Sequence, residues 1–181
     1  MKPTKTSAAP VKPCPSFQGA IRASGLHTKV RAIYHLFPLL SDCSERLAAH
    51  VGMRFPGETR LFVVECVATG VAQYHKAGLA SEEKRCVAFL SGLLSPALTL
   101  FKHRAVARRG EETFAWNPSE TTWEQFERRY GMSAIMFERC EADITPKSAA
   151  LMLACRVLPP QLTDRVVDAI LPSGCCKSLA D

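Results

Sequence analysis

The chain has 181 residues, which is enough for one domain with terminal extensions, since a domain typically holds about 100–200 residues. Its apolar fraction of 47% and charged fraction of 22% exclude wholesale disorder and allow a globular core. The composition also excludes collagen-like and coiled-coil chains, and the sequence shows no internal repeat.

The formal net charge of +6 is concentrated at the N-terminal end. Residues 1–41 contain six basic and no acidic residues, whereas residues 42–181 contain the remaining 17 basic and all 17 acidic residues. The first 16 residues include four prolines and few large apolar side chains, so we expect a mobile basic tail there. The prediction is a tail over residues 1–16, one helical domain over 17–172 and a frayed C-terminal tail over 173–181.

Eight cysteines could indicate disulfides in a small secreted protein. The chain begins Met-Lys-Pro-Thr-Lys without an apolar run, so we expect no secretory signal and a reducing, cytoplasmic location. No Cys-x-x-Cys motif and no Cys/His pair with zinc spacing occurs. Cys66, Cys86 and Cys155 fall in apolar helical runs and are predicted to be buried free thiols, while the role of Cys175 and Cys176 stays open.

The longest uncharged stretch, residues 86–101, is 16 residues long and is interrupted by Pro96. A membrane-spanning helix needs about 20 predominantly apolar residues. We therefore expect a buried pair of helices there and no membrane insertion.

Apolar spacing and helix-ending residues predict a mainly α-helical chain with one inserted β-hairpin. The hairpin spans residues 104–116 and turns at Gly110-Glu111-Glu112, and Thr121 or Thr122 caps the helix that follows it. In the helix predicted over residues 147–158, Leu151, Met152, Cys155 and Leu158 fall at helical spacing. A turn is expected around Pro56, over residues 54–57. The predicted helices are 26–37, 45–51, 59–76, 82–94, 123–130, a weak one at 133–141, 147–158 and 162–171.

Three segments in this order resemble an HD-superfamily domain, specifically the HD-like domain of MobH-type conjugative relaxases. They are Phe-Leu-Ser-Gly-Leu-Leu at 89–94, Trp-Asn-Pro at 116–118 and Arg-Val-Leu-Pro-Pro at 156–160. Gly57 and Glu65 also occupy places where that family has a Gly-Gly-Leu-Leu-x-His-x-Leu-Glu type segment. The resemblance covers about residues 50–171 and implies an HD-like helical bundle. The HDOD-type signalling domain, from the same superfamily, has a similar helix order.

The resemblance also implies that the HD metal site has been lost. Its His-Asp pair corresponds to Ser95-Pro96, its upstream His to Phe62 and its downstream His to the vicinity of Pro146. Phenyl and pyrrolidine side chains cannot bind a metal ion, and Ser is a poor ligand, so the site could not activate water. Leu98 and Thr99 stand where the family has Gly and Lys. We expect no catalytic residues, no metal and no cofactor.

No other catalytic arrangement stands out in the sequence. Ser95 lies in Leu-Leu-Ser-Pro and not in a Gly-x-Ser-x-Gly nucleophile elbow, and there is no glycine-rich phosphate loop. An enzyme with an unrelated active site stays open as a third hypothesis. No two of the five histidines are four residues apart, and we expect ordinary surface or core roles for them. They are His27, His35, His50, His75 and His103.

Basic and aromatic residues do gather around the predicted hairpin. Basic side chains beside aromatic rings can bind single-stranded nucleic acid through phosphate contacts and base stacking. The alternative is a solvated hairpin, with its aromatic rings docked on the core and its charge balanced by Glu111 and Glu112. The segment also contains Phe101, His103 and Phe114. The predicted nucleic-acid-binding residues are Lys102, Arg104, Arg108, Arg109 and Trp116.

These observations favour a catalytically degenerate relative of the relaxase HD domain. It would act as an accessory protein of a mobile element that binds single- or double-stranded DNA, or proteins of the conjugation machinery. The alternative is an HDOD-like helical adaptor that binds proteins in signalling and has no nucleic-acid role. The sequence does not indicate an oligomeric state.

Overall fold

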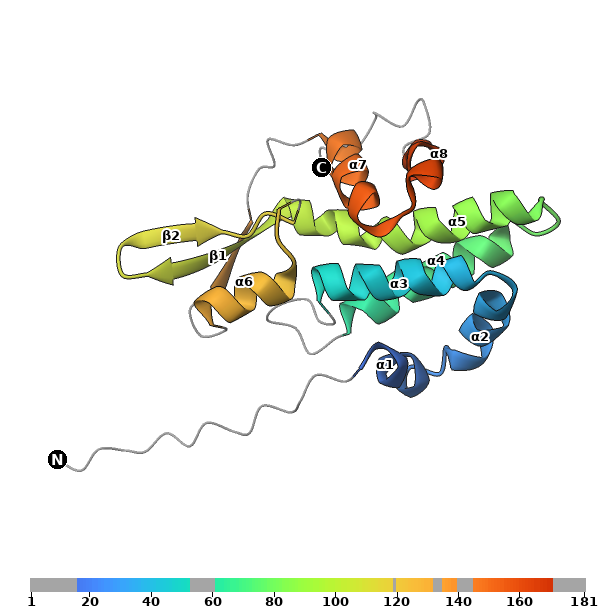
Figure 1. The fold of residues 1–181 in the computed structure, drawn as a ribbon, viewed down its shortest axis with the longest axis horizontal. Coiled ribbons are helices and arrows are strands. Elements are labelled where there is room, and N and C mark those ends of the chain that lie inside the picture. The colour runs from blue at the N-terminus through green and yellow to red at the C-terminus, as the bar shows by residue number, and fades with distance from the viewer. Residues whose placement is uncertain (1–15, 53–60, 119, 132–134, 140–144, 171–181) are drawn as a thin grey trace.

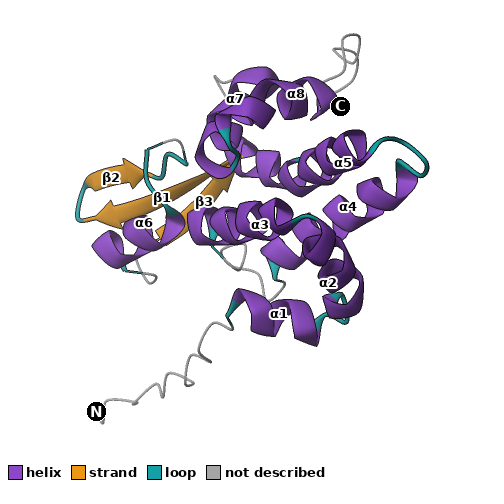
Figure 2. Cartoon of the chain, turned by 45° about the vertical axis from the view of Figure 1, so that its right-hand side comes forward, coloured by secondary structure: helices purple, strands orange, loops and turns teal. Residues whose placement is uncertain are grey.

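A computed structural model describes residues 16–52, 61–118, 120–131, 135–139 and 145–170. The described chain is mainly helical, with a small antiparallel sheet inserted between the fifth and seventh helices (Figure 1, Figure 2). The predicted fold class, mainly α with one inserted hairpin, is therefore confirmed. The helices are α1 (Phe17–Ala23), α2 (His27–Leu36), α3 (Pro38–Val51), α4 (Phe62–Lys76), α5 (Glu82–Leu94), α6 (Trp123–Tyr130), α7 (Pro146–Val157) and α8 (Pro160–Ile170).

Helix α5 lies at the centre of the molecule. The helices α3 and α4 pack on one side of it and α7 and α8 on the other (Figure 1). The chain reverses between α4 and α5 at Gly78, whose φ is 56°. The Ser81 hydroxyl caps the new helix by accepting a hydrogen bond from the Lys84 N–H. An ion pair between Arg165 and Glu83 joins α8 to the first turn of α5.

Two glycines let α4 and α5 approach closely. A Cβ atom on Gly92 would lie 2.8 Å from the backbone oxygen of Thr69 and 2.8 Å from the Cγ of Gln73. A Cβ atom on Gly70 would lie 3.0 Å from the backbone oxygen of Phe89. Because neither position has room for a methyl group, the crossing of α4 and α5 depends on both glycines.

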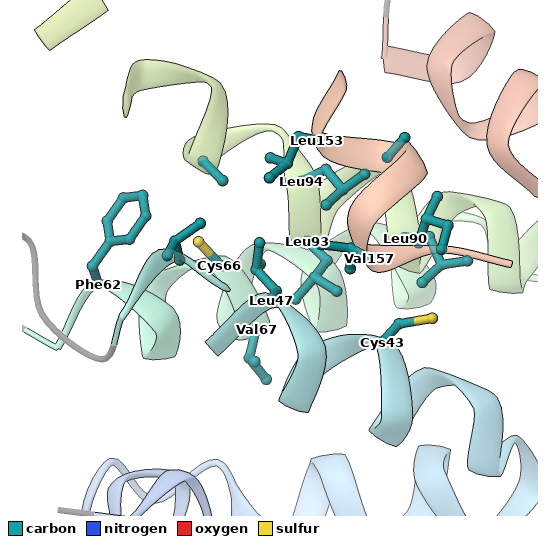
Figure 3. Packing of buried hydrophobic residues seen from close by; sticks show 14 of the residues in the cluster. Cys43, Leu47, Phe62, Cys66, Val67, Leu90, Leu93, Leu94, Leu153 and Val157 are labelled. Carbon is teal, nitrogen blue, oxygen red and sulfur yellow. The ribbon is translucent and has the colours of Figure 1, made fainter. Parts of the chain in front are cut away.

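The core is formed mainly by apolar side chains from α3, α4, α5 and α7 (Figure 3). Aliphatic residues fill most of it, and two free cysteines take the place of small apolar residues. Close-packed interiors of this kind tolerate little change in side-chain volume. The labelled residues in Figure 3 are Cys43, Leu47, Phe62, Cys66, Val67, Leu90, Leu93, Leu94, Leu153 and Val157.

The buried face of α7 differs from the predicted one. Leu151 is 41% exposed and Cys155 is exposed, so their prediction as core residues was wrong. Small alanines occupy the core-facing positions, since α7 packs closely against α3, α5 and α8. Cys66 is buried as predicted, and Cys86 is half-buried. The residues of α7 that are 0–2% exposed are Ala149, Ala150, Leu153, Ala154 and Val157.

The sheet has three strands, with the order β2-β1-β3 and both pairs antiparallel. A 3-10 helix, η1 (Pro96–Lys102), leads from α5 into the sheet. The predicted helix over residues 133–141 was wrong, because Ile135–Arg139 pairs with β1 as an edge strand. Its sequence, Ile-Met-Phe-Glu-Arg, is rich in residues that favour strands. The strands are β1 (His103–Arg109), β2 (Glu112–Ala115) and β3 (Ile135–Arg139).

Several helix boundaries also differ from those predicted. Helix α1 was not predicted, and Ser16 caps it by accepting a hydrogen bond from the Gly19 N–H, so Ser16 belongs to the folded part. Pro38 begins α3 instead of only ending α2, and Pro160 begins α8, because proline fits the first turn of a helix. The predicted turn at residues 54–57 and the two terminal tails beyond Ser16 and Ile170 lie outside the described residues.

Within the described residues, one 20-residue segment, Glu82–Phe101, is long and apolar enough to cross a membrane by length and composition alone. Its most apolar window has a mean hydropathy of 1.2, and 39% of that window is buried. In the structure this segment is divided between α5 and η1 at Pro96. Phe89, Leu90 and Leu93 are fully buried in the core. The absence of membrane insertion and the cytoplasmic location stay predictions.

Candidate nucleic-acid interface

The basic residues predicted to bind nucleic acid lie along one strand, but they do not share one face. Lys102 ends η1, and Arg104, Arg108 and Arg109 belong to β1. Successive residues of a strand point to opposite sides of the sheet, so Arg108 and Arg109 occupy positions on different faces. Arg108 is exposed. The side chains of Lys102, Arg104 and Arg109 are not among those that the structure describes.

The register of the sheet places acidic residues opposite two of these arginines. Arg104 pairs with Glu138 on β3, and Arg109 pairs with Glu112 on β2. Arg108 pairs with Thr113, which has no charge. Residues 102–116 contain four Lys or Arg and two Glu, which leaves a net charge of +2. The hairpin is basic, but its charge density is modest.

Trp116 does not present a ring for stacking on a base. Its side chain is 6% exposed, and its ring lies edge-on to Trp123 with the centroids 5.0 Å apart. Its Nε1–H donates a 3.0 Å hydrogen bond to the Thr121 carbonyl. Base stacking needs an accessible ring face. Because the Trp116 ring is buried in the core, the structure does not support its predicted role in stacking.

A different aromatic pair lies half-buried beside the hairpin. Phe114 on β2 stacks on Tyr130 at the end of α6, with centroids 4.8 Å apart and ring planes 24° apart. Tyr130 also contacts Phe126, at 4.9 Å between centroids. The Arg129 guanidinium lies 5.5 Å from the centre of the Tyr130 ring. We call Phe114, Arg129 and Tyr130 the Tyr130 patch.

Local interactions set the position of α6 and therefore of Tyr130. Thr122 and Gln125 form a capping box: the Thr122 hydroxyl accepts from the Gln125 N–H, and the Gln125 side chain accepts from the Thr122 N–H. Gly131, with a φ of 77°, ends the helix directly after Tyr130. Both ends of α6 were predicted from the sequence. The contact between Tyr130 and Phe114 was not, because the two residues belong to separate elements.

The charge of α6 is mostly balanced within the helix. Arg128 and Glu124 form an (i, i+4) ion pair at 2.6 Å, with both side chains more than 70% exposed. An exposed pair of this kind stabilises the fold by only about 0.3–0.5 kcal/mol. Arg128 is engaged in this ion pair, whereas the guanidinium of the adjacent Arg129 lies over the Tyr130 ring.

A buried histidine fixes the connection between β2 and α6. His50 on α3 is 9% exposed, and its Nε2–H donates to the Pro118 carbonyl at 2.5 Å. Burial lowers the pKa of His50, the hydrogen bond to Pro118 partly offsets this, and the charge of Arg156 lowers it further. The ring is therefore neutral and structural. The side chain of Asn117 donates to the Glu120 carboxylate at 2.9 Å and closes the same connection.

The positions that the predicted resemblance aligns with HD metal ligands offer no good metal ligand in the structure. Phe62 is 4% exposed in the core, Ser95 caps α5, Pro96 begins η1 and Pro146 begins α7. Within the described ranges, no group of three or more His, Cys, Asp or Glu side chains is arranged to hold a metal ion.

The buried thiols are poor nucleophiles. Burial raises the pKa of Cys43 to about 11 and that of Cys66 to about 12. Burial also raises the pKa of Cys86. Because the thiolate is the reactive form, these groups stay protonated and unreactive at neutral pH.

Comparison of the chain with models of known protein families, with curated proteins and with solved structures finds no match.

Proposed function

We propose that the protein is a non-catalytic protein that binds single-stranded DNA through the Tyr130 patch. The observation that supports this most is the half-buried stack of Phe114 and Tyr130 with the Arg129 guanidinium over it. A partly exposed aromatic pair and a neighbouring arginine are the kinds of group that bind unpaired bases and phosphates in many single-strand binders.

Base stacking and phosphate contacts together can supply enough free energy for weak DNA binding that depends on the salt concentration. Stacking of one base on an aromatic side chain contributes about 1–3 kcal/mol, and each phosphate contact releases counterions. With a hairpin charge of only +2, we expect few phosphate contacts and a shallow salt dependence. The basic segment before α1, which contains Lys2, Lys5 and Lys12, would add charge that is independent of the patch.

In its more specific form, the proposal is that this protein is related to the HD-like domain of conjugative relaxases. Helices α4, α5 and α7 all contact η1. This supports the relation, since the resemblance places the HD ligands on or beside these elements. The replacement of the ligands by Phe62, Ser95, Pro96 and Pro146 favours binding without hydrolysis. In this form the protein is an accessory protein of a mobile element.

The proposed function is tested by fluorescence anisotropy with labelled single- and double-stranded DNA over a salt series. The full chain is compared with a chain lacking residues 1–15, which keeps the Ser16 cap of α1. The proposal expects single-stranded DNA to bind more tightly than duplex, with an affinity that falls with salt and survives removal of the tail. Binding that disappears with the tail, or no binding by either chain, would overturn it.

A second candidate function, a protein–protein adaptor of the HDOD type, is favoured by one observation. Leu36 and Leu39, at the junction of α2 and α3, are 65% and 38% exposed. Neighbouring exposed leucines are more common at protein interfaces than on an inert surface. An adaptor would show no affinity for DNA at any salt concentration, and it would bind a partner protein less tightly after Leu36→Ser.

A further inference from the structure

A hollow of about 760 Å³ opens between α1, α2 and α3. Helices α1 and α2 lie on a part of the molecule remote from the sheet (Figure 1). All three helices contribute to its lining. The volume falls within the range of about 300–1,000 Å³ that is common for small-molecule sites. Because the hollow is separate from the Tyr130 patch, a ligand bound in it would be independent of the proposed DNA binding.

The charged groups of the hollow are mostly basic. Arg22 from α1 and Arg31 from α2 line it, together with His27 and His35, which lie four residues before and after Arg31 on the same face of α2. In the part of the chain that the structure describes, neither arginine forms an ion pair. Among the described residues of the lining, Asp42 is the one acidic group.

The nearby carboxylate of Glu45 is already engaged. It accepts a 2.9 Å hydrogen bond from the side-chain amide of Gln18, at the edge of the hollow. The lining therefore presents two guanidinium groups against one carboxylate. Guanidinium groups donate several hydrogen bonds in a fixed planar arrangement that matches phosphate oxygens.

The wall behind these groups is apolar and fixed. Ile21 and Val30 are 3% and 2% exposed, so most of their surface packs against the core. The Tyr34 hydroxyl donates to the Ser44 Oγ at 2.7 Å, and Ser44 donates to the Leu40 carbonyl at 2.7 Å. This chain of hydrogen bonds holds the Tyr34 ring in place, edge-on to Phe89 at 6.1 Å.

We propose that this hollow binds a small phosphate monoester with a flat apolar portion, with Arg22 and Arg31 on the phosphate and the partly exposed Tyr34 against the apolar portion. A phosphate monoester has a charge of about −1.5 to −2 at neutral pH and three acceptor oxygens, so it fits two arginines better than a carboxylate does. The chain's own first 15 residues do not fit, because their charged residues are all lysines.

The test is isothermal titration calorimetry of the full chain with AMP, adenosine and inorganic phosphate as probes. AMP contains both parts of the proposed ligand, and each of the other two probes contains one. We expect AMP to bind with a dissociation constant below about 1 mM, and adenosine and phosphate to bind at least tenfold more weakly. Arg22→Gln and Arg31→Gln should each weaken AMP binding about tenfold, as expected for the loss of a charged hydrogen bond.

Two further variants make the test specific. Lys29→Gln removes the same charge from the same helix, but Lys29 does not line the hollow, so it should leave AMP affinity within about twofold of the original. Asp42→Asn removes the opposing carboxylate and should tighten AMP binding about two- to fivefold. No detectable AMP binding, or equal losses in Lys29→Gln and Arg31→Gln, would overturn the proposal. These titrations contain no DNA, so their outcome is separate from the DNA-binding test.

Discussion

His50 on α3 and Pro118 before α6 are joined by a hydrogen bond that connects positions 68 residues apart in the chain. Close to it, Gly52 lies against Trp123, where a Cβ atom on Gly52 would lie 2.7 Å from the indole Cδ1. These two contacts attach the end of α3 to the start of α6, and α6 ends at Tyr130. The position of the Tyr130 patch on the bundle therefore depends on His50.

The burial of His50 predicts a dependence of stability on pH. Because burial lowers the pKa of His50 in the folded state, the unfolded chain takes up a proton more readily. The contribution of His50 to the free energy of unfolding is complete above the pKa of about 6.5 in the unfolded chain. It is lost as the pH falls from there through the lower pKa of the folded state. His50→Gln should lower the free energy of unfolding at pH 7.5 by about 1–3 kcal/mol.

Urea unfolding at pH 7.5, 6.5 and 5.5 measures this effect. The difference in stability between the original chain and His50→Gln should shrink toward pH 5.5. A difference that stays constant, or grows, as the pH falls would contradict the role given to His50.

Because α4 and α5 cross closely, we expect one added methyl group at Gly92 to destabilise the fold. Gly92→Ala places a Cβ atom 2.8 Å from the Thr69 backbone oxygen, which cannot move without shifting α4. We expect a loss of about 1–3 kcal/mol in the free energy of unfolding, although alanine favours helices more than glycine does. Ser91→Ala, on the neighbouring and only half-buried position, is the control and should change stability by less than about 0.5 kcal/mol. A Gly92→Ala protein more stable than the original would refute the close crossing.

The burial of Trp116 predicts that its substitution affects folding and not DNA affinity. Trp116→Phe removes the hydrogen bond to the Thr121 carbonyl and part of the contact with Trp123. We expect the free energy of unfolding to fall by about 1–3 kcal/mol, with no change in the affinity of the folded fraction for single-stranded DNA. Thermal unfolding and anisotropy on the same sample separate the two quantities. Reduced affinity at unchanged stability would restore Trp116 as a binding residue.

The environments of the cysteines predict an order of thiol reactivity. Cys155 is exposed, whereas Cys43 and Cys66 are buried with pKa values raised to about 11 and about 12. Brief treatment of the native protein with iodoacetamide at pH 7.5, followed by mass spectrometry of peptides, should find Cys155 modified and Cys43 and Cys66 unmodified. Modification of Cys66 as fast as that of Cys155 would show that the core opens.

Local sequence signals predicted the elements that they control directly. Gly78 and Ser81 mark the boundary of α4 and α5, and Thr122 and Gly131 mark the ends of α6, because capping and left-handed glycines act within a few residues. The hairpin also followed from its own residues. The predicted start of the helix after Pro38 was wrong, since a proline can both end one helix and begin the next.

Features that depend on tertiary contacts could not be predicted from the sequence. Residues 135–139 form a strand because β1 offers a free edge, although their pattern also permits a helix. The core-facing stripe of α7 is made of alanines such as Ala150 and Ala154, which apolar spacing alone does not favour over Leu151. Trp116 was predicted as a stacking residue because it is near the basic strand in sequence, whereas its burial depends on its contact with Trp123.

The most direct test of the proposed DNA binding compares two single-charge variants of the full chain. Arg129→Gln removes the guanidinium over Tyr130, and Arg46→Gln removes an exposed arginine of α3 that is not part of the patch. The measurement is the slope of log affinity for single-stranded DNA against log salt concentration. We expect Arg129→Gln to lower the affinity and to reduce the slope by about 1, with both quantities unchanged in Arg46→Gln. Equal affinities and slopes for the original chain and Arg129→Gln would contradict the assignment of DNA binding to the Tyr130 patch.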